Sequence, residues 1–148
     1  MKLLYGTSND SKIAYMKQQV ESLEIEIMVL KELMVLKELM VLKEFTALTD
    51  VDVLQRIDID ESGNNPLENA RIKAFAYFKA LKLPVFSCDT GLYIEGLDDE
   101  RQPGVHVRRV AGKHLNDEEM IDYYAGLAVE FGGRVTVEYK NAICFVLD

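Results

Sequence analysis

The chain has 148 residues, of which 49% are hydrophobic and 28% are charged, and its formal net charge is −8. This length and balance fit one globular domain with a sizeable apolar core, so we expect a single domain over residues 1–148. The negative charge argues against duplex nucleic acid as a partner, and the absence from the sequence of a signal peptide and of an apolar run of roughly 18 residues predicts a cytoplasmic protein that spans no membrane.

The first predicted unit is a strand, a polar turn and a helix. Residues 2–5 form a short apolar run that stops at Gly6, which predicts a buried strand. Residues 7–10 are rich in side chains that cap helices. The apolar residues that then recur at helical spacing are Ile13, Met16, Val20 and Leu23. This order of elements is typical of an α/β fold.

A tandem repeat follows a second predicted strand. Residues 24–27 alternate between charged and apolar side chains and run into a hexapeptide, Met-Val-Leu-Lys-Glu-Leu, that is written three times over 28–45 with Phe45 in the last place. The composition favours helix, but helical geometry rotates successive copies by about 240° and cancels the apolar face, so strand and helix both stay open. We interpret the repeat as a duplication without a catalytic role rather than as a partner-binding element, because solenoid repeats are normally about 20 residues or longer.

The remaining predicted elements continue the alternation of helix and strand. In chain order they are a polar loop over 58–66, a helix over 67–81, a strand over 85–88, a turn at 102–104, a helix from 116 or 117 to Gly132, and strands over 135–139 and 142–147. We therefore expect an α/β fold with a central mixed, twisted sheet and flanking helices.

Three polar segments carry candidate chemistry, and the first is 6–12. Backbone N–H groups at a helix N-terminus and the ammonium of Lys12 suit a phosphate. The segment is not the phosphate loop G-x-x-x-x-G-K-[ST], because Ser11 stands in place of the second glycine and Ile13 in place of the hydroxyl that binds Mg²⁺. Taken alone, a capped helix start with a solvated lysine explains the segment better.

The other two segments supply carboxylates. Over 60–74, Asp60 and Glu61 lie in a glycine-containing loop that can hold Mg²⁺, and Lys73 on the following helix can reach a phosphate. Over 87–92, Asp89 lies at the carboxyl end of a predicted strand, where α/β sheets bind ligands. An ordinary loop and an Asx turn at a strand end explain these two segments when each is taken alone.

In this order and spacing, the three segments resemble the inosine triphosphate pyrophosphatase family, which hydrolyses non-standard purine nucleoside triphosphates. The family opens with T-G-N-x-x-K, and residues 7–12 read Thr-Ser-Asn-Asp-Ser-Lys. It continues with E-T-G-x-[ST]-x-x-E-N-A-x-x-K-A, similar to 61–74, with D-[ST]-G-L, matched by 89–92, and with P-G-x-x-x-x-R, matched by 103–109. The resemblance covers the chain apart from two of the three hexapeptides.

The resemblance implies a Mg²⁺-dependent enzyme that releases a nucleoside monophosphate and pyrophosphate and forms a homodimer. By resemblance, Asp89 binds the metal and acts as the general base, and Glu61 is the second metal carboxylate. Lys12 and Lys73 complete the implied catalytic set by holding the phosphates. The residues implied to bind the substrate are Thr7, Ser8, Asn9, Lys12, Lys73 and Thr90.

The sequence departs from the family at the end that binds the base. The family motifs F-G-[YW]-D-P and S-H-R, which contact the purine, do not occur among the 148 residues, and Ser8 replaces the glycine of the first loop. We therefore expect a fold truncated at its C-terminal side, with the preferred base left open. The alternative function is a catalytically impaired relative that binds nucleotides or oligomerises without base specificity.

Overall fold

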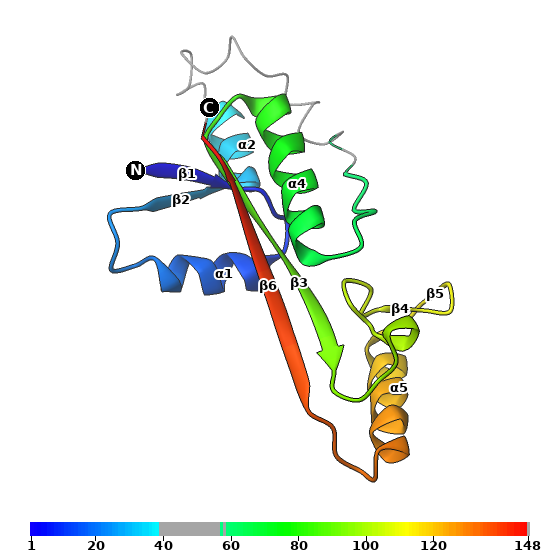
Figure 1. Cartoon of the computed structure of the whole chain (residues 1–148). Coiled ribbons are helices and arrows are strands. Elements are labelled where there is room, and N and C mark those ends of the chain that lie inside the picture. The colour runs from blue at the N-terminus through cyan, green and yellow to red at the C-terminus, as the bar shows by residue number, and fades with distance from the viewer. Residues whose placement is uncertain (39–56, 58, 148) are drawn as a thin grey trace.

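The computed structural model describes residues 1–38, 57 and 59–147 (Figure 1). Its elements are β1 Lys2–Tyr5, α1 Asp10–Gln19, β2 Glu26–Val29, α2 Leu30–Glu38, α4 Pro66–Leu81, β3 Val85–Ile94, η1 Asp99–Arg101, β4 Arg109–Val110, β5 Lys113–His114, α5 Asp117–Glu130 and β6 Val137–Val146. Four strands form a mixed sheet in the order β2-β1-β3-β6, in which β1 runs parallel to β2 and β3 while β6 runs antiparallel to β3. The predicted α/β fold with a mixed sheet is thereby confirmed.

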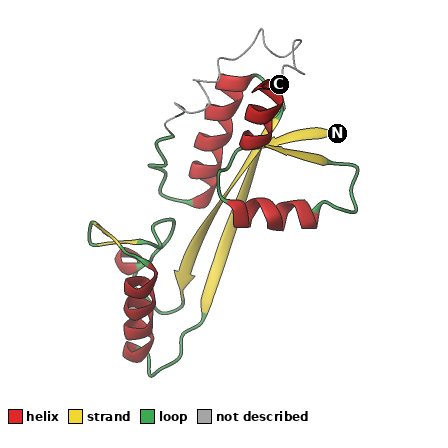
Figure 2. Cartoon of the chain, turned by 180° about the vertical axis from the view of Figure 1, so that it is seen from behind, coloured by secondary structure: helices red, strands yellow, loops and turns green. Residues whose placement is uncertain are grey.

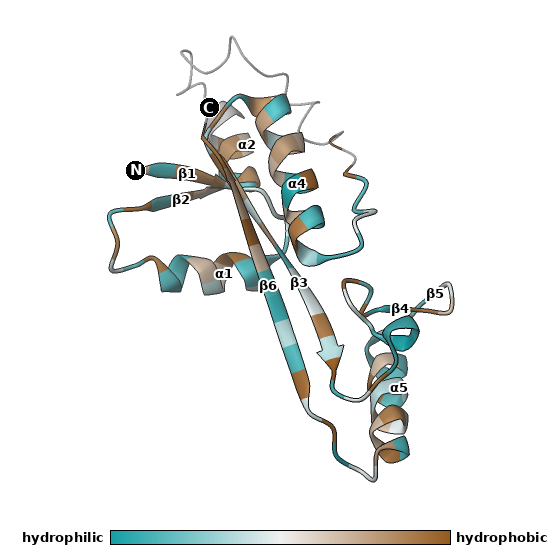
Figure 3. Ribbon diagram, viewed as in Figure 1, coloured by the Kyte–Doolittle hydropathy of each residue, from teal (hydrophilic) through white to brown (hydrophobic). Residues whose placement is uncertain are grey.

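Helices cover both faces of this sheet. Because successive strand residues point to opposite faces, Leu3 and Tyr5 of β1 pack with Ile13 of α1, whereas Leu4 packs with Leu33 of α2 and with α4. Figure 3 shows apolar residues gathered on α2 and on the end of β6 beside it. Within the described ranges, no helix is both long and apolar enough to cross a membrane.

The strands β3 and β6 continue together beyond the covered part of the sheet, as both views show (Figure 1, Figure 2). At their far end, Ile94 and Leu97 pack against Leu127 of α5 in a separate apolar cluster. The helix α5 begins at a capping box, in which Asn116 and Glu119 exchange hydrogen bonds between side chain and backbone. The start that the sequence predicts for this helix is therefore confirmed.

Three predicted strands were wrong in length. The strand predicted over 85–88 continues to Ile94, and the two strands predicted over 135–139 and 142–147 are the single strand β6. The cause is tertiary, because β3 and β6 pair without interruption from Val85 opposite Val146 to Ile94 opposite Val137. The polar residues that suggested strand ends lie inside this ladder.

The repeat begins as a strand and continues as a helix. The predicted strand over 24–27 is shifted to Glu26–Val29, so the first hexapeptide is divided between β2 and α2. Val29 and Leu33 of this copy are buried, and Glu32 accepts hydrogen bonds from Lys17 Nζ at 2.7 Å and from the Val29 backbone N–H at 3.1 Å. The part of the repeat over 39–45 lies outside the described residues.

Deleting residues 28–39 is expected to leave the protein folded, with an unfolding free energy within about 1 kcal/mol of the wild type or above it. The third copy, 40–45, would then follow Ile27 and supply the same side chains as the first copy, with Phe45 in place of Leu33. Urea denaturation of both proteins measures the difference, and deletion of 28–33 alone is the matched control. Loss of the folded, soluble protein in both deletions would show that the repeat length is structural.

Candidate functional site

The first loop of the candidate site begins where β1 ends. Gly6 donates its backbone N–H to Phe86 O at 2.8 Å, and Ser87 Oγ donates to Gly6 O at 2.9 Å, so the loop is fixed against β3. Asn9 then caps α1, because its side chain accepts the backbone N–H of Lys12 at 3.0 Å. These bonds place the N-terminus of α1 and Lys12 beside the carboxyl end of β1, where a helix favours anions.

The second loop precedes α4 and is tied to its first turns. Asn69 is buried, and its Oδ1 accepts the backbone N–H of Gly63 at 2.8 Å. Glu68 Oε2 accepts the backbone N–H of Asn64, also at 2.8 Å. The loop motif thus holds its own backbone in place, and it presents Glu61 toward α4 and β3.

Three charged side chains meet between α4, β3 and this loop. Lys73 Nζ lies 2.8 Å from Asp89 Oδ1 and 3.1 Å from Glu61 Oε2. The side chains of Lys73 and Asp89 are only 10% and 11% exposed, whereas that of Glu61 is 47% exposed. A buried ammonium needs such partners, because removal of one partner from a buried ion pair costs about 3–5 kcal/mol. The cluster therefore holds one positive charge between two carboxylates.

A cavity of about 210 Å³ adjoins this cluster. It is lined by Gly6, Thr7, Ser8, Asn9, Lys12, Ile59, Glu61, Lys73, Tyr77 and Asp89. A larger cavity of about 1070 Å³ shares Lys12, Glu61 and Asp89 with it and extends to the β4–β5 hairpin. The structure therefore brings together residues from all three polar segments that the sequence singles out.

Thr90 is the predicted site residue that lies apart. It lines the larger cavity but is not part of the smaller one. Its hydroxyl donates to Asn141 Oδ1 at 2.7 Å, across the β3–β6 pair. The Thr90 hydroxyl thus already has a partner on β6, which the sequence alone did not indicate.

Two neutral ionisable side chains lie near the charged cluster: Tyr77, which lines the smaller cavity, and Cys88, next to Asp89 in β3. Burial raises the pKa of Tyr77, and the charge of Glu61 raises this pKa further. Burial likewise raises the pKa of the Cys88 thiol. Both groups therefore keep their protons at neutral pH, which leaves the carboxylates of Glu61 and Asp89 as the candidate proton acceptors.

The same two carboxylates are the candidate metal ligands. Among the residues that the structure describes, no group of three or more His, Cys, Asp or Glu side chains is arranged to hold a metal ion by itself. Lys73 places a positive charge at the point where Glu61 and Asp89 converge, as a bound cation would. Hard divalent cations often take one or two carboxylates and complete their shell with water and substrate phosphates. The donors fit a cation that is shared with a phosphate ligand.

Sequence reasoning gave no role to several residues that build this site. Asn69 and Tyr77 lie one helical turn on either side of Lys73, and this spacing of four is a signal that could have placed them on the same face of α4. Other residues come from a segment without any periodicity. The basic and imidazole side chains of that segment that line the larger cavity are His106, Arg108, Arg109 and His114. Of these, only Arg109 was part of a sequence motif, which gave it no role.

Comparison with known sequences gives one family and several relatives. The model of the Ham1 family matches residues 3–148. A dITP/XTP pyrophosphatase of Coxiella burnetii is 31% identical over 121 residues, which are 82% of this chain and 49% of the relative. A dITP/XTP pyrophosphatase of Rhodopseudomonas palustris is 32% identical over 147 residues, which are 97% of this chain and 59% of the relative.

Solved structures agree with the fold. A HAM1 protein from Coxiella burnetii superposes with a TM-score of 0.67 at 26% identity, and the match covers 99% of this chain and 63% of the other. The Ham1 protein of Staphylococcus aureus superposes with the same TM-score of 0.67 at 22% identity, and the match covers 64% of the Staphylococcus aureus chain. This likeness supports the fold alone. The chain spans about half the length of the curated relatives that it matches first.

Proposed function

The chain belongs to the Ham1 family, and from this membership we propose that it hydrolyses non-standard purine nucleoside triphosphates to a nucleoside monophosphate and pyrophosphate, with Mg²⁺ as cofactor. The family match agrees with the resemblance drawn from the sequence motifs. The observation that carries the proposal is the meeting of Lys12, Lys73, Glu61 and Asp89 around one cavity. The name of the curated relatives, dITP/XTP pyrophosphatase, supports the same reaction class.

The phosphate chain would bind between α1 and α4. Lys12, in the first turn of α1, and Lys73, on α4, both line the cavity, so two ammonium groups from different helices can neutralise phosphate oxygens. We propose that Thr7, Ser8 and Asn9 of the first loop hold the same phosphates. Thr90 of the third segment lines the larger cavity, and we propose that it contacts the substrate there, in exchange for its bond to Asn141.

Asp89 is the proposed general base and Glu61 its partner carboxylate. Asp89 takes a proton from a water molecule, the water oxygen attacks the α-phosphorus, and the bond from that phosphorus to the bridging oxygen breaks to release pyrophosphate. Lys73 holds the Asp89 carboxylate in place through the 2.8 Å contact. Glu61 and Asp89 would hold the Mg²⁺, which neutralises charge on the phosphates when bound.

Pyrophosphate release is expected with Mg²⁺ and is expected to disappear when EDTA is added. The physical reason is that two lysines cannot neutralise a triphosphate and two carboxylates without a further cation. The assay compares inosine, xanthosine and the four standard nucleoside triphosphates with the full chain. Release that persists in EDTA would contradict the proposed cofactor, and restoration by added Mg²⁺ is the control.

The same assay distinguishes the proposed hydrolysis from the alternative function. Release from none of these nucleotides would favour a catalytically impaired relative that binds nucleotides or oligomerises. The cluster at Lys73 argues against that alternative, because a buried charge is costly unless a role retains it.

We also propose that the protein is a cytoplasmic homodimer, as the family resemblance implies. Several apolar side chains on α5 and along β6 are exposed, and association with a second chain removes such area from water. Those with the largest exposed fractions are Ile121, Val129, Tyr139 and Phe145. Analytical ultracentrifugation tests the proposal, and a particle with the 16.8 kDa mass of one chain would contradict it.

A further inference from the structure

The short hairpin of β4 and β5 contributes side chains to the 1070 Å³ cavity of the candidate site. Arg109 of β4 and His114 of β5 line this cavity, and neither has a role in the proposed function. Lys12 of α1 and Asp89 of β3 line the same cavity. A ligand that fills the cavity therefore contacts the hairpin as well as the charged cluster.

The pairing of the hairpin places its charges on two faces. Arg109 and His114 are direct partners in the β4–β5 ladder, so their side chains lie on the same face. Val110 and Lys113 form the other pair, on the opposite face, where Lys113 Nζ lies 2.6 Å from Glu119 Oε1 of α5. One face is thus held to α5, and the other borders the cavity.

The backbone of the hairpin is fixed before any ligand binds. Ala111 and Gly112, which join the two strands, have φ angles of 49° and 81°. Two successive positive φ angles are typical of the type I′ turn, whose twist matches that of the flanking strands. At the base of the hairpin, the buried Leu115 donates its backbone N–H to Arg108 O at 2.8 Å. The hairpin therefore presents its side chains from a defined position.

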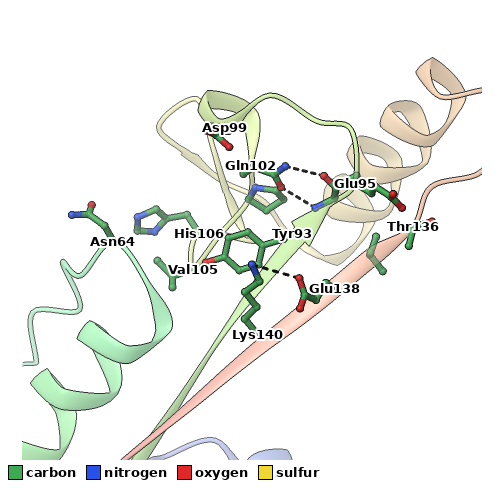
Figure 4. Close-up of a pocket in the computed structure, with 14 residues that line it drawn as sticks. Asn64, Tyr93, Glu95, Asp99, Gln102, Val105, His106, Thr136, Glu138 and Lys140 are labelled. Carbon is green, nitrogen blue, oxygen red and sulfur yellow. Dashed lines mark hydrogen bonds and ion pairs between the residues drawn. The ribbon is translucent and has the colours of Figure 1, made fainter.

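The segment that leads into the hairpin is fixed as well. Tyr124 of α5 donates its hydroxyl to Val107 O at 2.9 Å. Gln102 accepts the backbone N–H of Ile94 and donates to Ile94 O, each at 2.8 Å, in a neighbouring cavity of about 640 Å³ (Figure 4). His106, on the same segment, lines both cavities. Because this backbone is already ordered, a ligand that binds to the hairpin orders little beyond the side chains it contacts.

The lysine and arginine side chains of the larger cavity differ in their partners. Arg108 Nη1 lies 2.6 Å from Asp117 Oδ1 of α5. Lys12 and Arg109 form no ion pair with any residue that the structure describes. Two cations from separate elements that face one cavity suit a ligand with negative charge at two points.

We propose that Arg109 and His114 form an anion subsite for the pyrophosphate part of the substrate; the proposal rests on the proposed function. The guanidinium can donate two parallel N–H bonds to one phosphate group, and the imidazole N–H can donate a third. Lys12 binds the other phosphate group of the same pyrophosphate. When the bond from the α-phosphorus to the bridging oxygen breaks, negative charge develops on the departing pyrophosphate, and Arg109 neutralises part of it.

The test compares two inorganic ligands that differ by one phosphate group. Calorimetry measures the binding of orthophosphate and of pyrophosphate, at one Mg²⁺ concentration, to the full chain and its variants. Arg109→Gln should weaken pyrophosphate binding by roughly 10- to 100-fold, the range expected for lost hydrogen bonds to a charged group. Orthophosphate, which Lys12 can hold without the hairpin, should bind as it does to the wild type. Arg109→Lys keeps the charge but not the two parallel bonds, so it should lie between the wild type and Arg109→Gln.

Lys113→Gln is the matched control. It removes one positive charge from the same hairpin but on the opposite face, and Lys113 lines neither cavity of the candidate site. It should bind both ligands like the wild type. Equal losses of pyrophosphate affinity in Arg109→Gln and Lys113→Gln would overturn the subsite, because they would reflect net charge rather than a contact. An equal loss of both ligands in Arg109→Gln would overturn it too, because Arg109 would then share one phosphate group with Lys12.

These outcomes are independent of the proposed hydrolysis. Arg109 is exposed, so Arg109→Gln should unfold at the wild-type temperature, and Arg109→Lys supplies the same comparison if it does not. Unchanged pyrophosphate binding by Arg109→Gln would overturn the subsite even if the wild type releases pyrophosphate from nucleotides. Pyrophosphate binding that depends on Arg109, in a protein that releases pyrophosphate from no nucleotide, would support the anion subsite and contradict the hydrolytic function.

Discussion

Replacement of Asp89 by asparagine is expected to lower pyrophosphate release by about 1000-fold or more while the protein stays folded. Asparagine keeps the shape of the side chain and an oxygen that can accept from Lys73 Nζ, now 2.8 Å from Asp89 Oδ1. It cannot take a proton from water, and it is a weaker ligand for a hard cation. The change therefore removes the proposed base and a proposed metal ligand together, without removing the packing around them.

Steady-state pyrophosphate release and thermal unfolding of the same preparations test this expectation. Asp122→Asn is the matched control, because Asp122 is exposed on α5 and away from both site cavities. The control should keep wild-type activity. Asp89→Asn with activity within 10-fold of the wild type would contradict the role of Asp89 as base, whereas loss of activity with loss of folding would make the Asp89 contact structural. (The 10-fold limit is about 1.4 kcal/mol of barrier.)

Local signals in the sequence predicted elements whose ends are set by neighbouring residues. The run over 2–5 is the strand β1 as predicted, and Asn116 caps α5. These two predictions are correct because the signals are local. An apolar run followed by a glycine, or a capping residue followed by an acidic first turn, determines the structure within a few residues. The helix predicted over 67–81 is α4, although its first predicted residue, Leu67, is 52% exposed.

Pairing between distant parts of the chain forms continuous strands where local sequence signals predicted shorter ones. Asp89 and Thr90 resemble the end of a strand, and Lys140 and Asn141 resemble a turn, yet all four pair across β3 and β6. The repeat shows the same limit, because one hexapeptide is strand in β2 and helix in α2. The first part of the hexapeptide is a strand because it pairs with β1, and the second part is a helix that packs against α4. The hexapeptide sequence by itself does not distinguish these two conformations.

The candidate site could be predicted where motifs preserve the order of charged residues. The spacing of Glu61, Lys73 and Asp89 suggested that they act together. The structure places Lys73 Nζ within 3.1 Å of a carboxylate oxygen of each of the other two residues. The bond from Thr90 to Asn141 joins residues 51 positions apart, and the larger cavity is lined by residues from Lys12 to Met120. Such neighbours carry no mark in the sequence, because topology alone brings them together.

Substitution of Gly6 by alanine is expected to be the most destabilising single-methyl change near the site. A Cβ atom at position 6 would lie 2.4 Å from Tyr77 Cδ2 and 2.5 Å from Ser87 Oγ, both of which belong to buried side chains. In the sequence Gly6 indicated only the end of a strand, but in the structure it lies in direct contact range of side chains from both β3 and α4. Overpacking of this kind costs about 1–3 kcal/mol and sometimes more, and we expect about 2–4 kcal/mol here.

Because the clash involves Tyr77, the cost of Gly6→Ala should shrink when that ring is removed. Urea denaturation of Gly6→Ala, Tyr77→Leu and the double variant forms a mutant cycle, and the double variant should be more stable than the sum of the single changes predicts. Gly126→Ala in α5 is the matched control, since a Cβ there meets no atom within 4 Å and alanine favours helix by about 1 kcal/mol. A Gly6→Ala protein as stable as the wild type would show that α4 can move away from β1, in which case the distance from Lys73 to Asp89 is also not fixed by packing.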